Sequence, residues 1–170
     1  KKFRNPQYLF NIILNCKFKH NLCMNMFTNN ACNDVLEEYK SKLGESLVNY
    51  GYVPLNTALK AMRDSDILIS IGVTEGNQVS GKIFDYFATG KPIIHFYYLN
   101  DDPNLIYFKQ YPMSLCLKID INELDNNIRL FSEFCEKFAG KNIDFEEIKK
   151  IYNYATPEYV SNQIINEFYN

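Results

Sequence analysis

The sequence predicts an α/β fold: a doubly wound, Rossmann-like parallel sheet with extra C-terminal helices. One indication is a set of short, continuous apolar runs such as residues 67–71, which are typical of strands buried on both faces. A second is that these runs alternate with segments whose apolar residues recur at helical spacing. Because strands that alternate with helices form parallel sheets, we expect a single domain over residues 1–170.

The first half of the chain predicts helices that begin at recognisable caps. Asn5 followed by Pro6 suits a helix start, and Asp34 with Glu37 three residues later resembles a capping box. From Leu55, apolar residues recur at i, i+3, i+4 and i+7, which predicts a helix facing the core. Apolar or β-rich runs predict the first three strands, at 22–27, 47–53 and 67–71.

The second half predicts two more strands, at 93–98 and 114–119. A helix is expected over 79–88, ended by Gly90 as C-cap and by Pro92, which cannot continue a helix. Helices at the C-terminal end are expected over 124–138, after Asp144, and after Thr156 with Pro157. We expect the large aromatics of these helices in the core, among them Phe131, Phe134 and Phe168.

The composition argues against a nucleic-acid or membrane-spanning protein. Lys and Arg number 18 and Asp and Glu number 20, so the net charge of −2 lacks the basic excess of a nucleic-acid binder. Apolar runs are far shorter than a membrane span, and no signal or transit peptide is recognisable, so a cytoplasmic location is expected.

The cysteines and histidines predict no metal site. The five cysteines are odd in number and lack the close spacing of a zinc or redox pair, so we expect free, mostly buried thiols. The two histidines, His20 and His95, lie near no cysteine pair. We interpret His95 as a hydrogen-bonding residue at a strand end rather than a catalytic base.

The start of the chain predicts a partner domain. A doubly wound domain normally opens on a strand, whereas this chain opens on a helix and has no initiating Met. We therefore expect a fragment of a longer two-domain protein, with an N-terminal domain upstream.

Ligands of open parallel sheets bind beyond the carboxyl ends of the strands. Three predicted loops meet this condition: 50–54, 72–81 and 97–102. In the second loop, Gly76, Ser80 and Gly81 allow backbone N–H groups to approach a phosphate closely. Lys82 follows in the first helical turn, and Asp85 lies three residues later on the same side, where it can bind a ribose diol. The alternative that both are solvated helix residues remains open.

The stretch NQVSGKIFDYFATGKPII at 77–94 closely resembles the donor-binding segment of GT-B-fold glycosyltransferases. These enzymes have two Rossmann domains and build capsules and other surface polysaccharides from nucleotide sugars. VNYGYVPLNTALKAMRDSDILISIG at 48–72 is also similar to the family. The resemblance covers residues 5–98 well and the C-terminal helices loosely.

The resemblance implies a set of donor-binding residues. The loop would cradle the diphosphate and sugar, Asp85 would hold the donor ribose, and 52–54 would lie beside the base. The implied donor-binding residues are Gly76, Asn77, Gln78, Val79, Ser80, Gly81, Lys82, Asp85, Tyr52, Val53 and Pro54. The family pattern has Glu at both ends of a nine-residue stretch, where this chain has Asn77 and Asp85.

The resemblance also implies a hexosyltransferase that uses a nucleotide-diphosphate sugar as substrate, without a metal or further cofactor. The acceptor would be a saccharide or a lipid-linked acceptor, held with most catalytic groups by the upstream domain. Contact with the inner face of a membrane through that domain is left open. We expect the chain alone to bind donor without turnover. The alternatives are a nucleotide-sugar epimerase and a non-catalytic nucleotide-binding α/β module.

Overall fold

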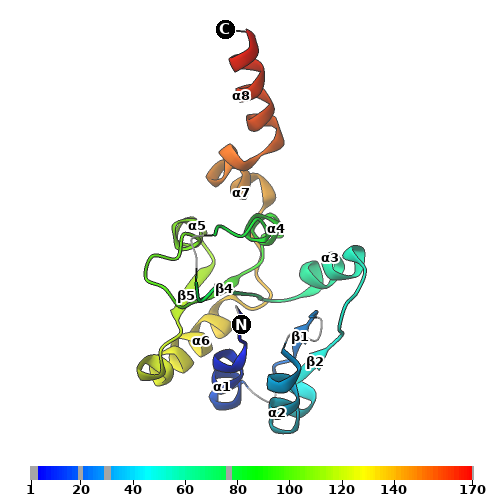
Figure 1. The fold of residues 1–170 in the computed structure, drawn as a ribbon, viewed down its shortest axis with the longest axis vertical. Helices are drawn as coiled ribbons and strands as arrows, with labels where there is room; N and C mark the ends of the chain where they lie inside the picture. The colour runs from blue at the N-terminus through cyan, green and yellow to red at the C-terminus, as the bar shows by residue number, and fades with distance from the viewer. Residues whose placement is uncertain (1–3, 19–20, 29–31, 76–77, 170) are drawn as a thin grey trace.

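The computed structural model is an α/β protein with two short parallel sheets, and it describes residues 4–18, 21–28, 32–75 and 78–169. In one sheet, β1 (Met24–Met26) pairs with β2 (Leu47–Asn49). In the other, β4 (Ile93–Tyr97) lies between β3 (Leu68–Ile71) and β5 (Ser114–Lys118). The α/β class and the parallel pairing are thus confirmed (Figure 1), while a single doubly wound sheet stays a prediction.

One hydrophobic cluster joins the two sheets. It contains residues of α1 (Gln7–Asn15), α2 (Asn33–Leu43) and α6 (Leu124–Phe138), together with residues of β2, β4 and β5. Phe10 of α1 is fully buried, and its ring centroid lies 5.3 Å from that of Tyr39 on α2. Both sheets therefore share part of one core.

A second cluster covers the opposite face of the three-stranded sheet. It is built by α4 (Lys82–Ala88), α5 (Leu105–Gln110) and α7 (Phe145–Ile151). Ile93 belongs to this cluster and Ile94 to the first, because successive side chains of a strand point to opposite faces. Phe87 of α4 is buried and stacks on Tyr152, with ring centroids 4.6 Å apart.

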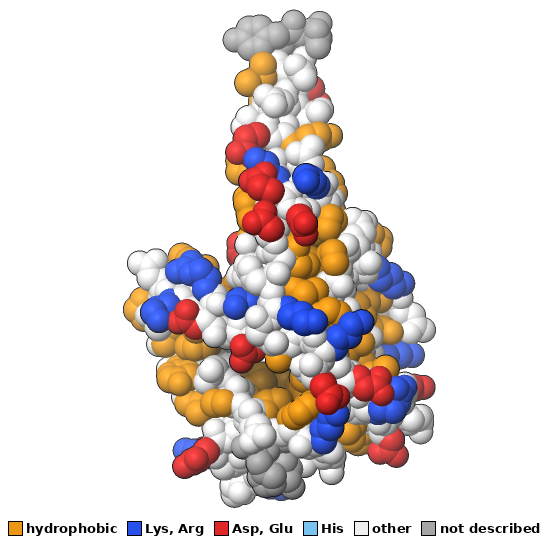
Figure 2. Space-filling view, turned by 180° about the vertical axis from the view of Figure 1, so that it is seen from behind, with side chains coloured by type: hydrophobic (Ala, Val, Ile, Leu, Met, Phe, Trp, Pro, Cys, Tyr) orange, Lys and Arg blue, Asp and Glu red, His pale blue; other side chains and the backbone are white. Residues whose placement is uncertain are grey.

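Two helices lie at the margin of these clusters. α3 (Leu55–Asp64) has no fully buried residue and Leu55 is 72% exposed, but Met62 packs against the second cluster, so the prediction of a core-facing helix is confirmed only in part. α8 (Pro157–Tyr169) extends away from the body of the molecule (Figure 1), and hydrophobic and charged side chains lie side by side along α7 and α8 (Figure 2). Phe131 and Phe134 are buried as expected, but Phe168 on α8 is 83% exposed.

Hydrogen bonds at the helix starts test the predicted boundaries. Asp144 is the N-cap of α7 and its Oδ1 accepts from the backbone N–H of Glu146, as predicted. Asn5 Oδ1 accepts from the backbone N–H of Gln7, but the N-cap of α1 is Pro6, one residue later than predicted. Gly90 has a φ of 71°, a conformation that glycine adopts without strain. The described residues also include short 3-10 helices, at η2 (Gly44–Ser46), η3 (Ile121–Glu123) and η4 (Asn153–Ala155).

Other boundaries differ from the prediction. α2 begins at Asn33, so Asp34 lies inside the first turn and the predicted capping box is wrong. β2 ends at Asn49 rather than at residue 53, and Gly51 soon follows with a φ of 68°. α4 begins at Lys82 rather than at 79, and α5 was not predicted.

The cysteines are free thiols, as expected; three of them are buried, Cys116 is half-buried and Cys23 is exposed. Across the described ranges, no group of three or more His, Cys, Asp or Glu side chains could hold a metal ion. Within the same ranges, no helix combines the length and the apolar character needed to cross a bilayer.

Candidate functional site

A cavity of about 380 Å³ lies between the two sheets. β1 and β3 contribute strand residues to its lining, and β3 is followed by Gly72 and Val73 at its carboxyl end. Ala58 and Met62 of α3 also line it, which explains why this amphipathic helix has no buried residue: its apolar face borders the cavity. The remaining walls include Arg4, the segment around residues 78–83, and the side chains of Tyr86, His95 and Asn104.

Two cationic side chains line this cavity. Arg4 precedes α1, and its Nε donates to the backbone oxygen of Ile71, 3.1 Å away, at the last residue of β3. Lys82 is the first residue of α4. Among the described residues, neither forms an ion pair with a carboxylate. The cavity therefore carries positive charge that the described part of the chain does not neutralise.

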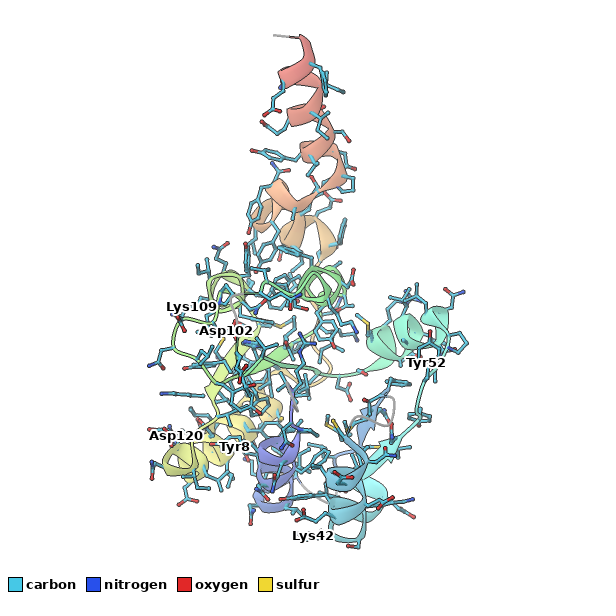
Figure 3. The ribbon with its side chains drawn as sticks, viewed as in Figure 1. Tyr8, Lys42, Tyr52, Asp102, Lys109 and Asp120 are labelled. Atoms are coloured by element: carbon cyan, nitrogen blue, oxygen red, sulfur yellow. The ribbon has the colours of Figure 1, made fainter. Side chains whose placement is uncertain are left out.

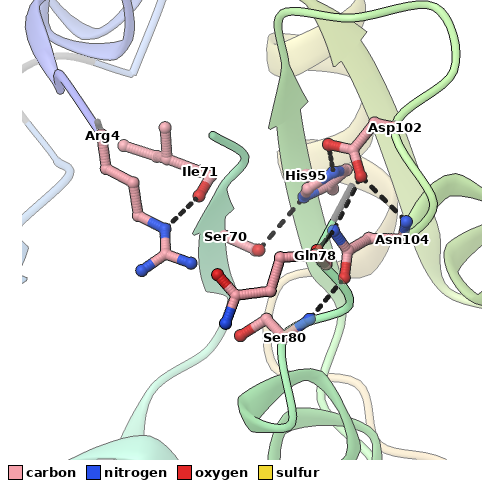
Figure 4. Close-up of polar contacts among 8 residues, drawn as sticks. All are labelled: Arg4, Ser70, Ile71, Gln78, Ser80, His95, Asp102 and Asn104. Carbon is pink, nitrogen blue, oxygen red and sulfur yellow. Dashed lines mark hydrogen bonds and ion pairs between the residues drawn. The ribbon is translucent and has the colours of Figure 1, made fainter. Parts of the chain in front are cut away.

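A buried row of polar side chains borders the cavity (Figure 4). His95 Nδ1 lies 3.1 Å from Ser70 Oγ, and these residues face each other in the register of β3 and β4. His95 Nε2 lies 3.3 Å from Asp102 Oδ2. His95 and Asp102 are 1% and 5% exposed, so solvent does not compete for these bonds. His95 is a hydrogen-bonding residue as predicted, but it lies in the middle of β4 and not at a strand end.

Asp102 is held as a carboxylate. Burial raises the pKa of this carboxyl, but the hydrogen bonds from His95 and from the backbone and side chain of Asn104 outweigh burial and lower the pKa. Asp102 Oδ1 accepts from Asn104 N at 2.8 Å and from Asn104 Nδ2 at 2.7 Å. An ionised carboxylate can only accept a hydrogen bond, so His95 must be the donor in its contact with Asp102 and carries a proton on Nε2.

Asn104 connects this buried row to the predicted phosphate loop. Its Oδ1 accepts from the backbone N–H of Ser80 at 2.9 Å, and its Nδ2 donates to the backbone oxygen of Gln78 at 3.2 Å. Asn104 is 4% exposed. One buried amide thus holds two backbone groups of the loop that precedes α4.

Gly72 leaves room for Asp102. A Cβ at Gly72 would lie 2.6 Å from Asp102 Oδ2 and 3.3 Å from the backbone oxygen of Phe96. The first distance is too short for non-bonded atoms, so a side chain at this position would displace the carboxylate.

The Ser70, His95 and Asp102 side chains share the residue types of a hydrolase triad, but their surroundings do not suit one. A triad needs free N–H groups beside the nucleophile to bind an oxyanion. Here the N–H of Gly72 donates to Phe96 O at 2.7 Å, and that of Ser80 donates to Asn104. Ser70 itself lies inside β3. The row therefore supports the loop rather than forming a nucleophilic centre.

The structure brings only some of the predicted donor-binding residues to the cavity. Gln78, Ser80 and Lys82 line it. Val79, Gly81 and Asp85 are exposed and lie outside the lining, so the ribose role of Asp85 stays a prediction. Gly76 and Asn77 lie outside the described residues.

The predicted base-binding residues also lie outside the cavity lining. Tyr52 is 92% exposed, on the segment between β2 and α3 (Figure 3), Val53 is half-buried, and Pro54 directly precedes α3. A different aromatic group lies closer. Phe27, which lines the cavity, stacks on Tyr50 with ring centroids 5.1 Å apart and an interplanar angle of 12°.

The residues that sequence reasoning missed are Arg4, Asp102 and Asn104. Asp102 ends one of the three loops expected at the carboxyl edge, at 97–102, so its neighbourhood was indicated. Nothing in the local sequence distinguishes Arg4 from a surface cation, or Asn104 from an ordinary turn residue. Comparison of the chain with protein-family models, with curated proteins and with solved structures found no match.

Proposed function

We propose that this chain is the donor-binding domain of a GT-B-fold glycosyltransferase. It binds a nucleotide-diphosphate sugar in the cavity between β1 and β3, for transfer to a saccharide or lipid-linked acceptor. The resemblance of residues 77–94 to the donor-binding segment of that family supports the proposal. Gln78, Ser80 and Lys82, all within that stretch, line the cavity.

The observation that carries the proposal is the pair of cations in one cavity. Arg4 precedes α1 and Lys82 begins α4, so the two residues are far apart in the sequence. Both line the same cavity, and neither has a carboxylate partner among the described residues. A diphosphate is a compact anion that guanidinium and ammonium groups bind well. The same charges would stabilise the nucleoside diphosphate as it departs from the sugar.

The strand order supports a ligand at this point. β1 pairs with β2, and β3 begins the second sheet, while β1 and β3 both line the cavity. If the two sheets are parts of one doubly wound sheet, its order is β2-β1-β3-β4-β5, and the chain reverses direction of winding between β1 and β3. Open α/β sheets bind ligands at such a switch point, beyond the carboxyl ends of the strands.

Besides the two cations, the cavity offers an apolar surface for the base of a nucleotide. The side chains of Met24, Met26 and Met62 provide an apolar surface for a flat base, because Met adapts to irregular contacts. The volume of about 380 Å³ is within the usual range of small-molecule sites. The acceptor and the catalytic groups would come from an upstream domain, so the chain alone would bind donor without transferring sugar.

Calorimetric titration of the chain with uridine, guanosine, adenosine and thymidine diphosphates and their common sugar conjugates tests the proposal. We expect saturable binding of one nucleotide class. Loss of one charge-assisted contact in Arg4→Ala or Lys82→Ala should weaken it about tenfold or more. Lys40→Ala is the matched control, because Lys40 is an exposed lysine of α2 that is not part of the cavity.

Two outcomes count against the proposal. One is the absence of binding across the panel, and the other is binding that Arg4→Ala and Lys82→Ala leave at the level of Lys40→Ala. Asp85→Ala in the same titration tests the ribose prediction separately, since Asp85 lies outside the cavity lining.

A further inference from the structure

The loop before α4 has an unusual means of support. Where a loop lines a ligand cavity, its backbone groups must be held without using the surface that meets the ligand. Here Ser80 N–H and Gln78 O are bound by the side chain of Asn104, which lies 24 and 26 residues further along the chain. Gln78, Ser80 and Asn104 all form part of the cavity wall.

The orientation of the Asn104 amide is itself determined by a neighbour. The Asn104 amide can bind Ser80 N–H only when its Oδ1 points toward the loop. If the amide were flipped, its Nδ2, which is a donor, would face the Ser80 N–H, which is also a donor. Asp102 prevents the flip, because its carboxylate accepts from Asn104 Nδ2 at 2.7 Å. The backbone N–H of Asn104 donates to the same oxygen. Asp102 thus selects the amide orientation that holds the loop.

Asp102 is oriented in turn by the sheet. Its second oxygen contacts His95 Nε2, and the His95 ring is held between Ser70 Oγ and the ring of Phe108, whose centroid lies 4.2 Å away. Because His95 and Ser70 are on the paired strands β4 and β3, the row begins on hydrogen-bonded strands of the three-stranded sheet. Its far end is the loop at residues 78–80.

We propose that Asn104 is a positioning residue for ligand binding: held by Asp102, His95 and Ser70, it fixes residues 78–80 as a preformed wall of the cavity. The identity of the ligand in this inference rests on the proposed function, whereas the fixing of the loop does not. A preformed wall spares the ligand the entropic cost of ordering the loop, so loss of Asn104 weakens binding by loosening residues 78–80, in addition to any contact that Asn104, which also lines the cavity, makes with the ligand.

The first test compares Asn104→Ala with Asn127→Ala. Asn127 is also 4% exposed and bonded through Nδ2, to Tyr8 Oη and Lys118 O, but does not line the cavity. Hydrogen–deuterium exchange is measured on both variants, and the nucleotide diphosphates of the panel are titrated at a temperature where both are folded. We expect faster exchange over residues 78–82 and about tenfold weaker nucleotide binding in Asn104→Ala only.

A second variant gives a readout that a general loss of stability does not produce. Asn104→Asp keeps an oxygen for Ser80 N–H but sets a carboxylate against Asp102, so nucleotide binding should be weak at about pH 8. At about pH 5, the carboxylates of Asp102 and of the introduced Asp share one proton. The resulting O–H donates in place of Asn104 Nδ2, so nucleotide binding should recover in part. Within the described ranges, the titratable groups that interact with Asp102 are His95 on β4 and Cys116 on β5, so unsubstituted protein is titrated over the same range.

The unsubstituted chain supplies a measurement that depends on no variant. The amide of Ser80 lies outside any helix or strand, but it should exchange slowly by NMR, because it is half-buried and its N–H donates to the buried side chain of Asn104.

The outcomes separate this inference from the proposed function. A rapidly exchanging Ser80 amide, equal effects of Asn104→Ala and Asn127→Ala on nucleotide binding, or an Asn104→Asp variant without pH-dependent recovery would each overturn the positioning role. If unsubstituted protein binds no nucleotide but Asn104→Ala alone loosens residues 78–82, the loop is positioned as proposed and the proposed function is wrong.

Discussion

Replacing Gly72 by Ala tests the close approach of Asp102 to the end of β3. The added Cβ would lie 2.6 Å from Asp102 Oδ2 and 3.3 Å from the backbone oxygen of Phe96. Gly72 does not have a positive φ, so its backbone conformation is open to alanine and any effect is steric. Asp102 cannot move freely, because His95 and Asn104 hold both of its oxygens. We therefore expect the carboxylate to lose its contact with His95.

The magnitude follows from two contributions. Overpacking by one methyl group costs about 1–3 kcal/mol, and a lost hydrogen bond to a charged group costs about 1.5–3 kcal/mol. Because relief of the clash and loss of the bond are partly the same event, the two do not add fully, and we expect a loss of about 3 kcal/mol. With an m-value of about 2 kcal/mol/M, the urea midpoint should fall by about 1.5 M.

Urea unfolding followed by circular dichroism measures this change. Gly81→Ala is the matched control, because a Cβ at Gly81 meets nothing within 4 Å and its φ of −55° suits alanine. That variant should be as stable as the unsubstituted protein or slightly more so. Equal urea midpoints for Gly72→Ala and Gly81→Ala would refute the reasoning, since Asp102 could then not lie against Gly72.

Two further predictions concern Asp102, in the buried polar row, and Phe87, in the second hydrophobic cluster. The pKa of Asp102 is lower in the folded state than in the unfolded state, so its carboxylate stabilises the fold fully at pH values above the ordinary pKa of about 4. This stabilisation is lost as the pH falls through the lower pKa of the folded state. Asp102→Asn should be less stable than unsubstituted protein at neutral pH by a margin that shrinks below about pH 4; urea midpoints showing a constant margin would contradict this. Phe87→Ala should cost about 3–5 kcal/mol by urea unfolding, because Phe87 is 1% exposed and stacks on Tyr152. Phe168→Ala, at a residue 83% exposed, should change stability by less than about 0.5 kcal/mol, and comparable losses in the two variants would argue against the assigned core.

The elements of this fold could be predicted from the sequence wherever a local rule governs them. The strands at 93–98 and 114–119 were found within a residue or two, because continuous apolar runs mark strands buried on both faces. Asp144 was correctly predicted to open a helix, because a cap bonds to a backbone group two residues away, while the start predicted at Asn5 was one residue too early. α5 was missed because its six residues are too few to show a helical period.

Local patterns were misleading where tertiary packing decides burial. α3 has the apolar spacing of a core helix, yet Ala58 and Met62 line a cavity and Leu55 is 72% exposed. Phe168 has the character of a core aromatic, but α8 extends away from the body and leaves it exposed. Periodicity shows that a helix has an apolar face, but what that face meets depends on elements elsewhere in the chain.

The sequence by itself determined the α/β class, most of the helices and strands, and the loop at 72–81 as the region of interest, since each depends on residues close together in the chain. Only the tertiary structure decided that Arg4 and Lys82 line one cavity and that Asn104 holds the loop. The physical reason is that these contacts depend on strand register. Pairing of β3 with β4 sets Ser70 beside His95, and the loop after β4 carries Asp102 and Asn104 back to residues 78–80.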